Sequence, residues 1–304
     1  MHTRKVSVWL AAAALTIASF VATSARAAEP VTVTVTAVGK GNSEPPPVKK
    51  EDVELYKGKE RLQASDWRKG EALFLAVLID DSLNQDIASQ WRDLRAFFAA
   101  QPQTTYIGVF YGRNGAAMVA QDFTQDHDLA AKALRIPTGG FGAFSSPYLE
   151  LEDLIKRLPG EGQRRSIMMI SSGVDYFHGN WGPYSPDLDP TIEQAQKANI
   201  NVWTLYAPDS GHVGRGFFRV NNAQSELSQL SEETGAESYF LGFGMPVTFK
   251  PYFDEISTHL NNQYMLTFEG SGGKKGKFER VRVTSELKGV EFMVPSMVYL
   301  PKGS

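Results

Sequence analysis

Cysteine is absent from the 304-residue sequence, and histidine occurs only five times. Without cysteine the chain has no disulfide, no thiolate zinc site, no iron–sulfur cluster and no cysteine nucleophile. The histidines are too scattered for the His-Glu-x-x-His helix of zinc proteases. These absences exclude the common cysteine-based and zinc-protease chemistries.

Long apolar runs are also lacking, except at the N-terminus. Arg4 and Lys5 precede an apolar run over residues 6–22, and Ala25-Arg26-Ala27 has the small-x-small pattern of a cleavage site. We therefore predict that residues 1–27 are a signal peptide and that the protein is exported, either periplasmic or secreted. An uncleaved membrane anchor is the alternative, but the run falls short of the roughly 20 residues that a span requires. After cleavage we expect no integral membrane span.

Basic residues are not in excess. Lysine and arginine total 31 against 34 acidic residues, which gives a formal net charge of −3. Loss of the leader removes three basic residues and no acidic one, so the net charge becomes −6. Nucleic acid is therefore not expected as a partner. A hydrophobic content of 42% is enough to build a core.

Both ends of the chain have β-structure patterns. Residues 31–38 alternate β-branched and other residues with a period of two, and residues 263–268, 277–287 and 290–300 also indicate strands. Hairpins at the two ends would not be stable alone, so we predict one small β-sandwich built from residues 28–70 and 262–304.

The middle of the chain, residues 71–261, has a different pattern. Nearly unbroken apolar runs cover residues 72–79, 105–111, 166–170 and 201–207, as in strands that are covered on both faces. Amphipathic helical patterns lie between them. The predicted fold class is α/β: a doubly wound, mostly parallel, Rossmann-like sheet inserted into the terminal β-sandwich.

A loop that could bind a metal follows the first apolar run of this middle segment. Asp80, Ser82 and Asn84 are spaced i, i+2, i+4, so three oxygen-bearing side chains could face one hard cation such as Mg²⁺ or Ca²⁺. The alternative is that Ser82 or Asn84 caps a helix beginning near Gln85, with Asp80 held by backbone N–H groups at the same helix end.

These residues and several longer segments resemble the von Willebrand factor A (vWA) domain, and more closely the exported proteins of acidobacterial type that contain it. The resemblance covers nearly the whole mature chain. It includes the strand-Asp-x-Ser-x-polar element at residues 80–84 and a helix-Thr-Gly-strand segment, LSQLSEETGAESYF, at residues 227–240. It implies the Rossmann-like vWA fold and a metal-ion-dependent adhesion site made of Asp-x-Ser-x-Ser, a distant Thr and a later Asp.

Several positions depart from that pattern. Asn84 replaces the last serine of the motif, Ser145 or Ser146 takes the place of the threonine, and Ser172 takes the place of the later aspartate. Asp175, or Asp81, could supply the missing carboxylate. The resemblance therefore implies a degenerate site that binds Mg²⁺ or Ca²⁺ weakly, with metal candidates Asp80, Ser82, Asn84, Ser145, Ser172 and Asp175.

Two loops predicted at the same edge of the sheet, residues 174–190 and 211–222, are rich in aromatic residues. Aromatic and arginine side chains dominate binding hot spots, because they bring large area and few rotatable bonds. The partner-binding candidates are Tyr176, Phe177, Trp181, Tyr184, Arg215, Phe217 and Phe218. The alternative is that these rings fold back to cover the end of the sheet.

Together these features predict an exported, non-enzymatic binding protein that recognises a protein partner at the top of a vWA-like domain through a degenerate metal site. The alternative is a metal-independent interaction or structural vWA module that uses the aromatic loops at residues 174–190 and 211–222. No G-x-S-x-G nucleophile motif occurs in the sequence. A third reading, ranked below both, is a metal-assisted hydrolase that uses Asp80 or Asp175.

Overall fold

The computed structural model describes residues 29–140, 142–178, 184–210, 217–239, 244 and 247–303. The predicted leader, Trp181 and Arg215 lie outside the described residues, as does the side chain of Phe217. No helix within the described ranges is long and apolar enough to cross a membrane.

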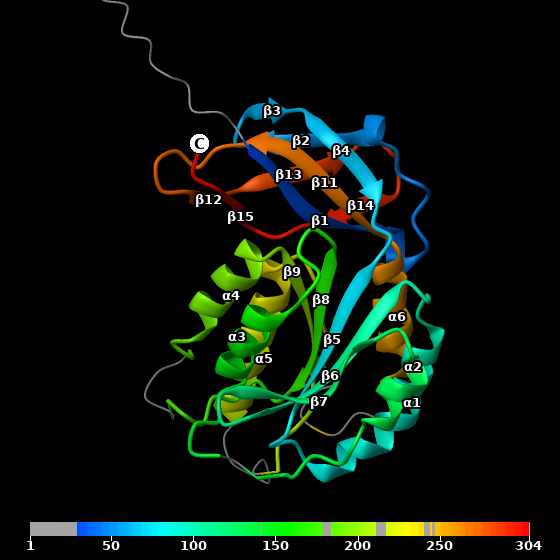
Figure 1. Ribbon diagram of the computed structural model, residues 1–304, viewed down its shortest axis with the longest axis vertical. Helices are drawn as coiled ribbons and strands as arrows, with labels where there is room; N and C mark the ends of the chain where they lie inside the picture. Colours follow the sequence, from blue (N-terminus) through cyan, green and yellow to red (C-terminus); the bar gives the residue numbers. More distant parts are fainter. Residues whose placement is uncertain are drawn as a thin grey trace, which may run out of the picture.

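A six-stranded sheet forms the centre of the molecule (Figure 1). Its strand order is β10-β9-β8-β5-β6-β7, and every neighbouring pair is parallel except β6 and β7. The strands are β5 (Leu73–Asp80), β6 (Thr105–Arg113), β7 (Ala116–Thr124), β8 (Arg164–Ser171), β9 (Ile200–Tyr206) and β10 (Ser238–Tyr239). The order changes direction at β5, so the loops after β5 and β8 leave the same edge of the sheet.

Helices cover both faces of this sheet (Figure 1). Successive residues of β5 point to opposite faces: Leu75 and Val77 join one apolar core with α1 and α6, and Leu78 joins a second core with α3 and α4. The helical elements are η3 (Gln85–Gln90), α1 (Trp91–Ala100), α2 (His127–Lys132), α3 (Pro147–Arg157), α4 (Leu188–Lys197), α5 (Phe217–Glu233) and α6 (Lys250–Asn261).

Strands from both ends of the chain build antiparallel sheets above the central one (Figure 1). The sheets have the orders β14-β1-β11-β4, β13-β2-β3 and β12-β15, and they share one apolar core. Val33 of the first strand pairs with Leu266 of β11, which joins the two ends of the chain. The elements are β1 (Glu29–Gly39), η1 (Lys40–Asn42), η2 (Lys50–Asp52), β2 (Val53–Lys57), β3 (Glu60–Leu62), β4 (Ala64–Lys69), β11 (Gln263–Gly270), β12 (Lys277–Glu279), β13 (Val281–Ser285), β14 (Val290–Met293) and β15 (Val298–Leu300).

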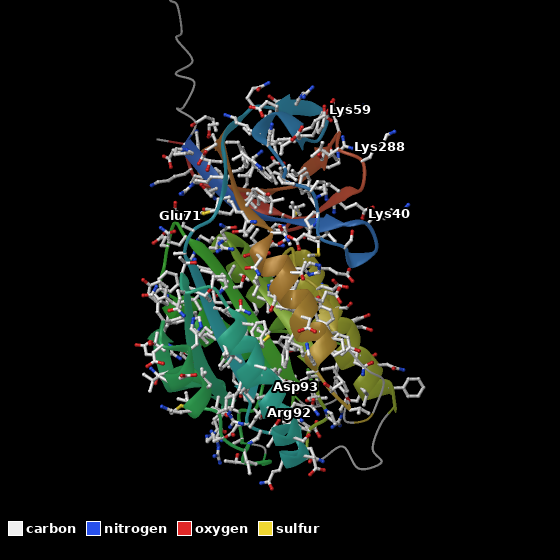
Figure 2. The ribbon with its side chains drawn as sticks, turned by 90° about the vertical axis from the view of Figure 1, so that its right-hand side faces the viewer. Lys40, Lys59, Glu71, Arg92, Asp93 and Lys288 are labelled. Atoms are coloured by element: carbon white, nitrogen blue, oxygen red, sulfur yellow. The ribbon has the colours of Figure 1, made fainter. Side chains whose placement is uncertain are left out.

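The predicted fold class is confirmed, with a mostly parallel α/β sheet and antiparallel sheets from both chain ends. Figure 2 shows Lys40, Lys59 and Lys288 on the terminal sheets, Arg92 and Asp93 at the far end, and Glu71 at the junction. The domain limits at residues 28–70, 71–261 and 262–304 stay a prediction.

Three strands differ from the sequence prediction. Residues 277–287 divide into β12 and β13, and residues 290–300 divide into β14 and β15 on either side of Pro295, because each half pairs with a different strand. Proline cannot donate a ladder hydrogen bond, which explains the break. The antiparallel edge strand β7 was not predicted, since only one of its nine residues is buried and its apolar pattern is weak.

Candidate functional site

Asp80 lies at the point where the order of the parallel strands reverses. It is the last residue of β5, and the last residue of the neighbouring strand β8 is Ser171. In sheets of this kind ligands bind beyond the carboxyl ends of the strands at such a position. The loops that follow β5 and β8 therefore form the candidate site.

The Asp80 carboxylate is buried and accepts hydrogen bonds at both oxygens. Its Oδ1 accepts from the backbone N–H of Ser82 at 2.9 Å and from the Ser82 hydroxyl at 2.6 Å. Its Oδ2 accepts from the Ser171 hydroxyl at 2.9 Å. Burial raises the pKa of Asp80 above its ordinary value, and the hydrogen bonds from Ser82 and Ser171 oppose that effect. We call Asp80, Ser82 and Ser171 the Asp80 cluster.

Among the six predicted metal ligands, the hydrogen bonds join only Asp80 and Ser82. The Asn84 side chain accepts from the Asp86 N–H at 2.9 Å and so caps η3, as the alternative reading expected. The Ser172 hydroxyl accepts from the Val174 N–H at 3.3 Å. Ser171, one residue earlier, occupies the position beside Asp80 that was assigned to Ser172.

Asp175 and Ser145 organise the neighbouring loop. The Asp175 carboxylate accepts from the N–H groups of Phe177 and His178 and from the Ser185 hydroxyl. The Ser145 carbonyl accepts from the N–H groups of Tyr176 and Phe177, each at 2.9 Å. Asp175 therefore organises the 174–190 loop internally, and Ser145 holds the start of that loop against the segment that precedes α3.

Asp81 anchors the loop that connects α2 to α3. Its Oδ1 accepts from Arg135 Nη1 at 2.6 Å and from the Thr138 N–H at 3.0 Å, and its Oδ2 accepts from the Thr138 hydroxyl at 3.0 Å. The Arg135 guanidinium also lies 3.7 Å from the centre of the Tyr111 ring. The carboxylate of Asp81 is thus engaged by this loop.

Glu150, on α3, is a buried acid that the sequence analysis did not select. It is 2% exposed, and its Oε1 has no hydrogen-bond partner among the described residues. Burial, followed by the negative charge of Asp80, raises the pKa of Glu150 to about 10, so this side chain is neutral at pH 7. The sequence did contain one signal for a buried acid at this position, because Glu150 falls on the apolar face of α3, beside Leu151 and four residues before Leu154.

These residues do not fit a tightly bound divalent cation. The Asp80 cluster offers one carboxylate and two hydroxyls, and the nearby Glu150 is uncharged. Divalent cations such as Ca²⁺ and Mg²⁺ are held mainly by carboxylates, which offset the loss of hydration. The predicted set of six metal ligands stays a prediction.

Four exposed aromatic side chains come from the loops and helix start at this edge of the sheet. We call Phe144, Phe177, Tyr184 and Phe218 the aromatic rim; their exposure ranges from 40% to 79%. The rings of Phe144 and Phe177 lie 5.3 Å apart. Phe144 was not predicted, because the glycine-rich segment at residues 139–144 gives no distinctive pattern.

Tyr176 differs from the rim residues. Its hydroxyl donates to the Asp209 carboxylate, and the Arg219 guanidinium lies 5.7 Å from the centre of its ring. This ring folds back onto the sheet end, as the alternative reading expected for the aromatic loops. Its assignment to a partner-binding surface stays a prediction.

No protein-family model and no curated protein sequence matches the chain. A von Willebrand factor type A protein from Catenulispora acidiphila is similar in structure, with 10% identity, 92% of this chain and 75% of that chain covered, and a TM-score of 0.45. Manganese-loaded TRAP protein from Plasmodium vivax has 12% identity, coverage of 83% and 99%, and a TM-score of 0.41. An aerotolerance-related membrane protein from Bacteroides fragilis has 15% identity, coverage of 62% and 99%, and a TM-score of 0.42.

At such identities the likenesses concern the fold and nothing finer. The relation to exported proteins of acidobacterial type stays a prediction. The central unit is a mostly parallel six-stranded sheet with one antiparallel edge strand and helices on both faces. It is inserted between the chain ends that build the antiparallel sheets, it is similar in fold to von Willebrand factor A structures, and we call it the vWA-like domain.

Proposed function

We propose that this chain is an exported, non-enzymatic binding protein that recognises a protein partner at the carboxyl edge of its vWA-like sheet. The observation that carries the proposal is the aromatic rim. Four aromatic side chains from the loops and the helix start at this edge are exposed, and the rings of Phe144 and Phe177 lie 5.3 Å apart. Exposed apolar groups that gather in one place mark interaction sites more often than single ones do.

The rim is attached to a well-ordered base. Asp81 and Arg135 fix the segment that leads to Phe144, and Asp175 and Ser145 fix the segment that carries Phe177. A surface that is held in place before binding loses less conformational entropy when the partner docks. The anchoring therefore favours recognition by this edge.

The test compares capture of exported proteins from the source organism by three immobilised forms of the chain. We expect the wild type and Met118→Ser to retain the same partner band, and the double variant Phe144→Ser/Phe177→Ser to lose it. Met118 is the matched control, because it is 58% exposed on the edge strand β7. Equal capture by all three forms would contradict the proposal.

Weak binding of Mg²⁺ or Ca²⁺ by the Asp80 cluster is the second candidate, because two hydroxyls and one carboxylate converge there. If a cation completes recognition, capture should fail in chelator and recover with millimolar Mg²⁺, and Asp80→Asn should abolish the recovery. We expect capture to persist in chelator, since the donor set is poor in charge.

Hydrolysis by Asp80 or Asp175 has less support, because hydrogen bonds from their own loops engage both carboxylates.

Export rests on the leader pattern at residues 1–27. N-terminal sequencing of the protein recovered from the periplasm or medium should begin at Ala28. Recovery of the full-length chain from the membrane fraction would instead favour the retained anchor.

A further inference from the structure

A second group of metal-ligand side chains lies at the β10 edge of the central sheet. Glu255 and His259 are four residues apart on α6, and Glu237 immediately precedes β10. One ligand atom from each of the three side chains lies within 4.8 Å of the others. Glu237 lies beside the middle of β9, at the β10 edge of the sheet, and two strands, β9 and β8, separate β10 from β5, which ends at Asp80, so the two groups are separate.

His259 is the most informative member of this group. Its imidazole is 2% exposed and stacks on Trp203, with ring centres 5.4 Å apart. Its Nδ1 has no hydrogen-bond partner among the described residues. Buried polar atoms in proteins nearly always have a hydrogen-bond partner. The unpartnered Nδ1 of His259 is therefore a candidate ligand atom for a bound ion.

The protonation state of His259 suits metal binding. Burial lowers the pKa of His259 to about 4, so the ring is neutral at pH 7. A neutral imidazole is the form that coordinates a metal ion. No proton therefore needs to leave this ring when a cation binds at neutral pH.

The two glutamates supply the negative charge. Burial raises the pKa of Glu237 and of Glu255, and the charge of Glu237 raises that of Glu255 further. The Tyr239 hydroxyl lies 3.4 Å from Glu237 Oε2, where it can orient that carboxylate. A cation between the two carboxylates would replace their repulsion with attraction.

Another group, Asp175, His178 and Asp187, also brings ligand atoms together. There, however, His178 Nδ1 lies 2.9 Å from Asp175, which also accepts from the Ser185 hydroxyl. Its imidazole nitrogen already has a protein partner. The group containing His259 is therefore the stronger candidate.

We propose that Glu237, Glu255 and His259 bind one divalent transition-metal ion, of which Zn²⁺ is the best suited. One imidazole and two carboxylates form a mixed nitrogen and oxygen donor set, which suits Zn²⁺, whereas Mg²⁺ and Ca²⁺ prefer oxygen ligands alone. The bound ion links α6 to the segment before β10. The proposal is independent of partner binding at the aromatic rim.

The test is a calorimetric titration of the chelator-treated, dialysed whole protein with ZnCl₂, and separately with MgCl₂ and CaCl₂. We expect one Zn²⁺ per chain and much weaker binding of the other two ions. Glu237→Gln and Glu255→Gln should each weaken Zn²⁺ binding at least about tenfold. Asp254→Asn, on the same helix and exposed, is the matched control and should leave the affinity unchanged.

Two further measurements keep the result decisive. The melting temperature in chelator should be the same in the glutamine variants as in the wild type, or higher, because removing a buried carboxylate does not cost stability there. Co²⁺ should give a visible absorption band that His259→Gln abolishes. The proposal is overturned if no Zn²⁺ binds at about 100 μM. It is also overturned if both glutamine variants bind Zn²⁺ like the wild type, or if Asp175→Asn or Asp80→Asn removes the binding.

Discussion

At the scale of single residues, the site depends on two buried acids, Asp80 and Glu150. Burial raises the pKa of both, but Asp80 accepts three hydrogen bonds that oppose this effect, whereas Glu150 has an unpartnered Oε1 and a pKa of about 10. The charge of Asp80 raises the pKa of Glu150 further. The hydrogen bonds of the Asp80 cluster make it a structural element that links the ends of β5 and β8.

Asp80→Ala should destabilise the fold. The change leaves the Ser82 N–H and the Ser82 and Ser171 hydroxyls without their acceptor in a buried place. We expect the free energy of unfolding to fall by about 2–4 kcal/mol. Urea denaturation measures this, with the exposed Asp128→Ala as control; equal stability of the two variants would contradict it.

Glu150→Gln should stabilise the protein at alkaline pH. The folded-state pKa of about 10 lies above the ordinary value of 4.5, so the folded chain holds a proton that the unfolded chain releases. Wild-type stability is therefore full below pH 4.5 and falls as the pH rises towards 10. Glutamine cannot titrate, so its variant escapes this loss.

Urea denaturation at several pH values tests this expectation. We expect Glu150→Gln to exceed the wild type by about 1–3 kcal/mol near pH 8 and to match it near pH 4.5. A deficit that is the same at every pH would mean that Glu150 is ionised in the fold.

At the scale of elements, Gly173 controls how the loop after β8 passes α5. Its φ is +69°, and a Cβ there would lie 2.9 Å from the carbonyl oxygen of Ala223 and 2.9 Å from Cγ of Leu227. Both atoms belong to α5, which is packed on the sheet and cannot move away freely. Only glycine fits this position.

Gly173→Ala should therefore lower the free energy of unfolding by more than an alanine does at a position whose only constraint is a positive φ. We expect a loss of about 2–4 kcal/mol from strain and overpacking. Gly162→Ala is the matched control, because Gly162 has φ of +80° and nothing within 4 Å of the added Cβ. It should cost about 1 kcal/mol. Equal losses in thermal unfolding would show that the contact with α5 does not matter.

The elements most visible in the sequence are those with strong local periodicity. The run at residues 72–79 predicted β5, which the structure places at Leu73–Asp80, and the apolar stripe of α3 was equally clear. The strand end could not be fixed to one residue, and a shift of one residue reverses the side to which a side chain points. The hydroxyl of Ser171, the last residue of β8, hydrogen-bonds to Asp80, and the sequence pattern alone could not select it over Ser172.

Contacts between distant segments gave no sequence signal. The group of Glu237, Glu255 and His259 depends on how α6 packs beside β10, and only its i, i+4 pair could be seen along the chain. The same holds for Phe144 and Phe177, whose rings meet across two loops. Local pattern predicts elements, but the site arises from how they pack.

At the scale of the whole molecule, Arg164 of β8 lies at the junction between the vWA-like domain and the terminal sheets. Its side chain donates to the Leu260 carbonyl at 2.6 Å and to the Glu71 carbonyl at 3.2 Å, next to the two places where the chain passes between the two parts. Burial lowers the pKa of Arg164 to about 10, which still leaves it charged at pH 7. Figure 2 shows Glu71 at this junction.

Arg164→Met should weaken the coupling between the two parts. We expect a loss of about 2–4 kcal/mol and separate unfolding transitions for Trp67, in the terminal sheets, and Trp203, in the central sheet. Arg92→Met, with its side chain 90% exposed, should behave like the wild type. Single-tryptophan variants followed by fluorescence in urea give the two signals, and coincident transitions in Arg164→Met would contradict the expectation.

The central claim is that a protein partner docks on the carboxyl edge of the sheet. Site-specific photo-crosslinking tests it most directly, with a photoreactive phenylalanine placed at Phe177 or, as control, at Met118 of β7 and irradiated in the source organism. We expect a discrete cross-linked partner from position 177 and none from position 118. A partner cross-linked only from position 118, or none from 177, would contradict it.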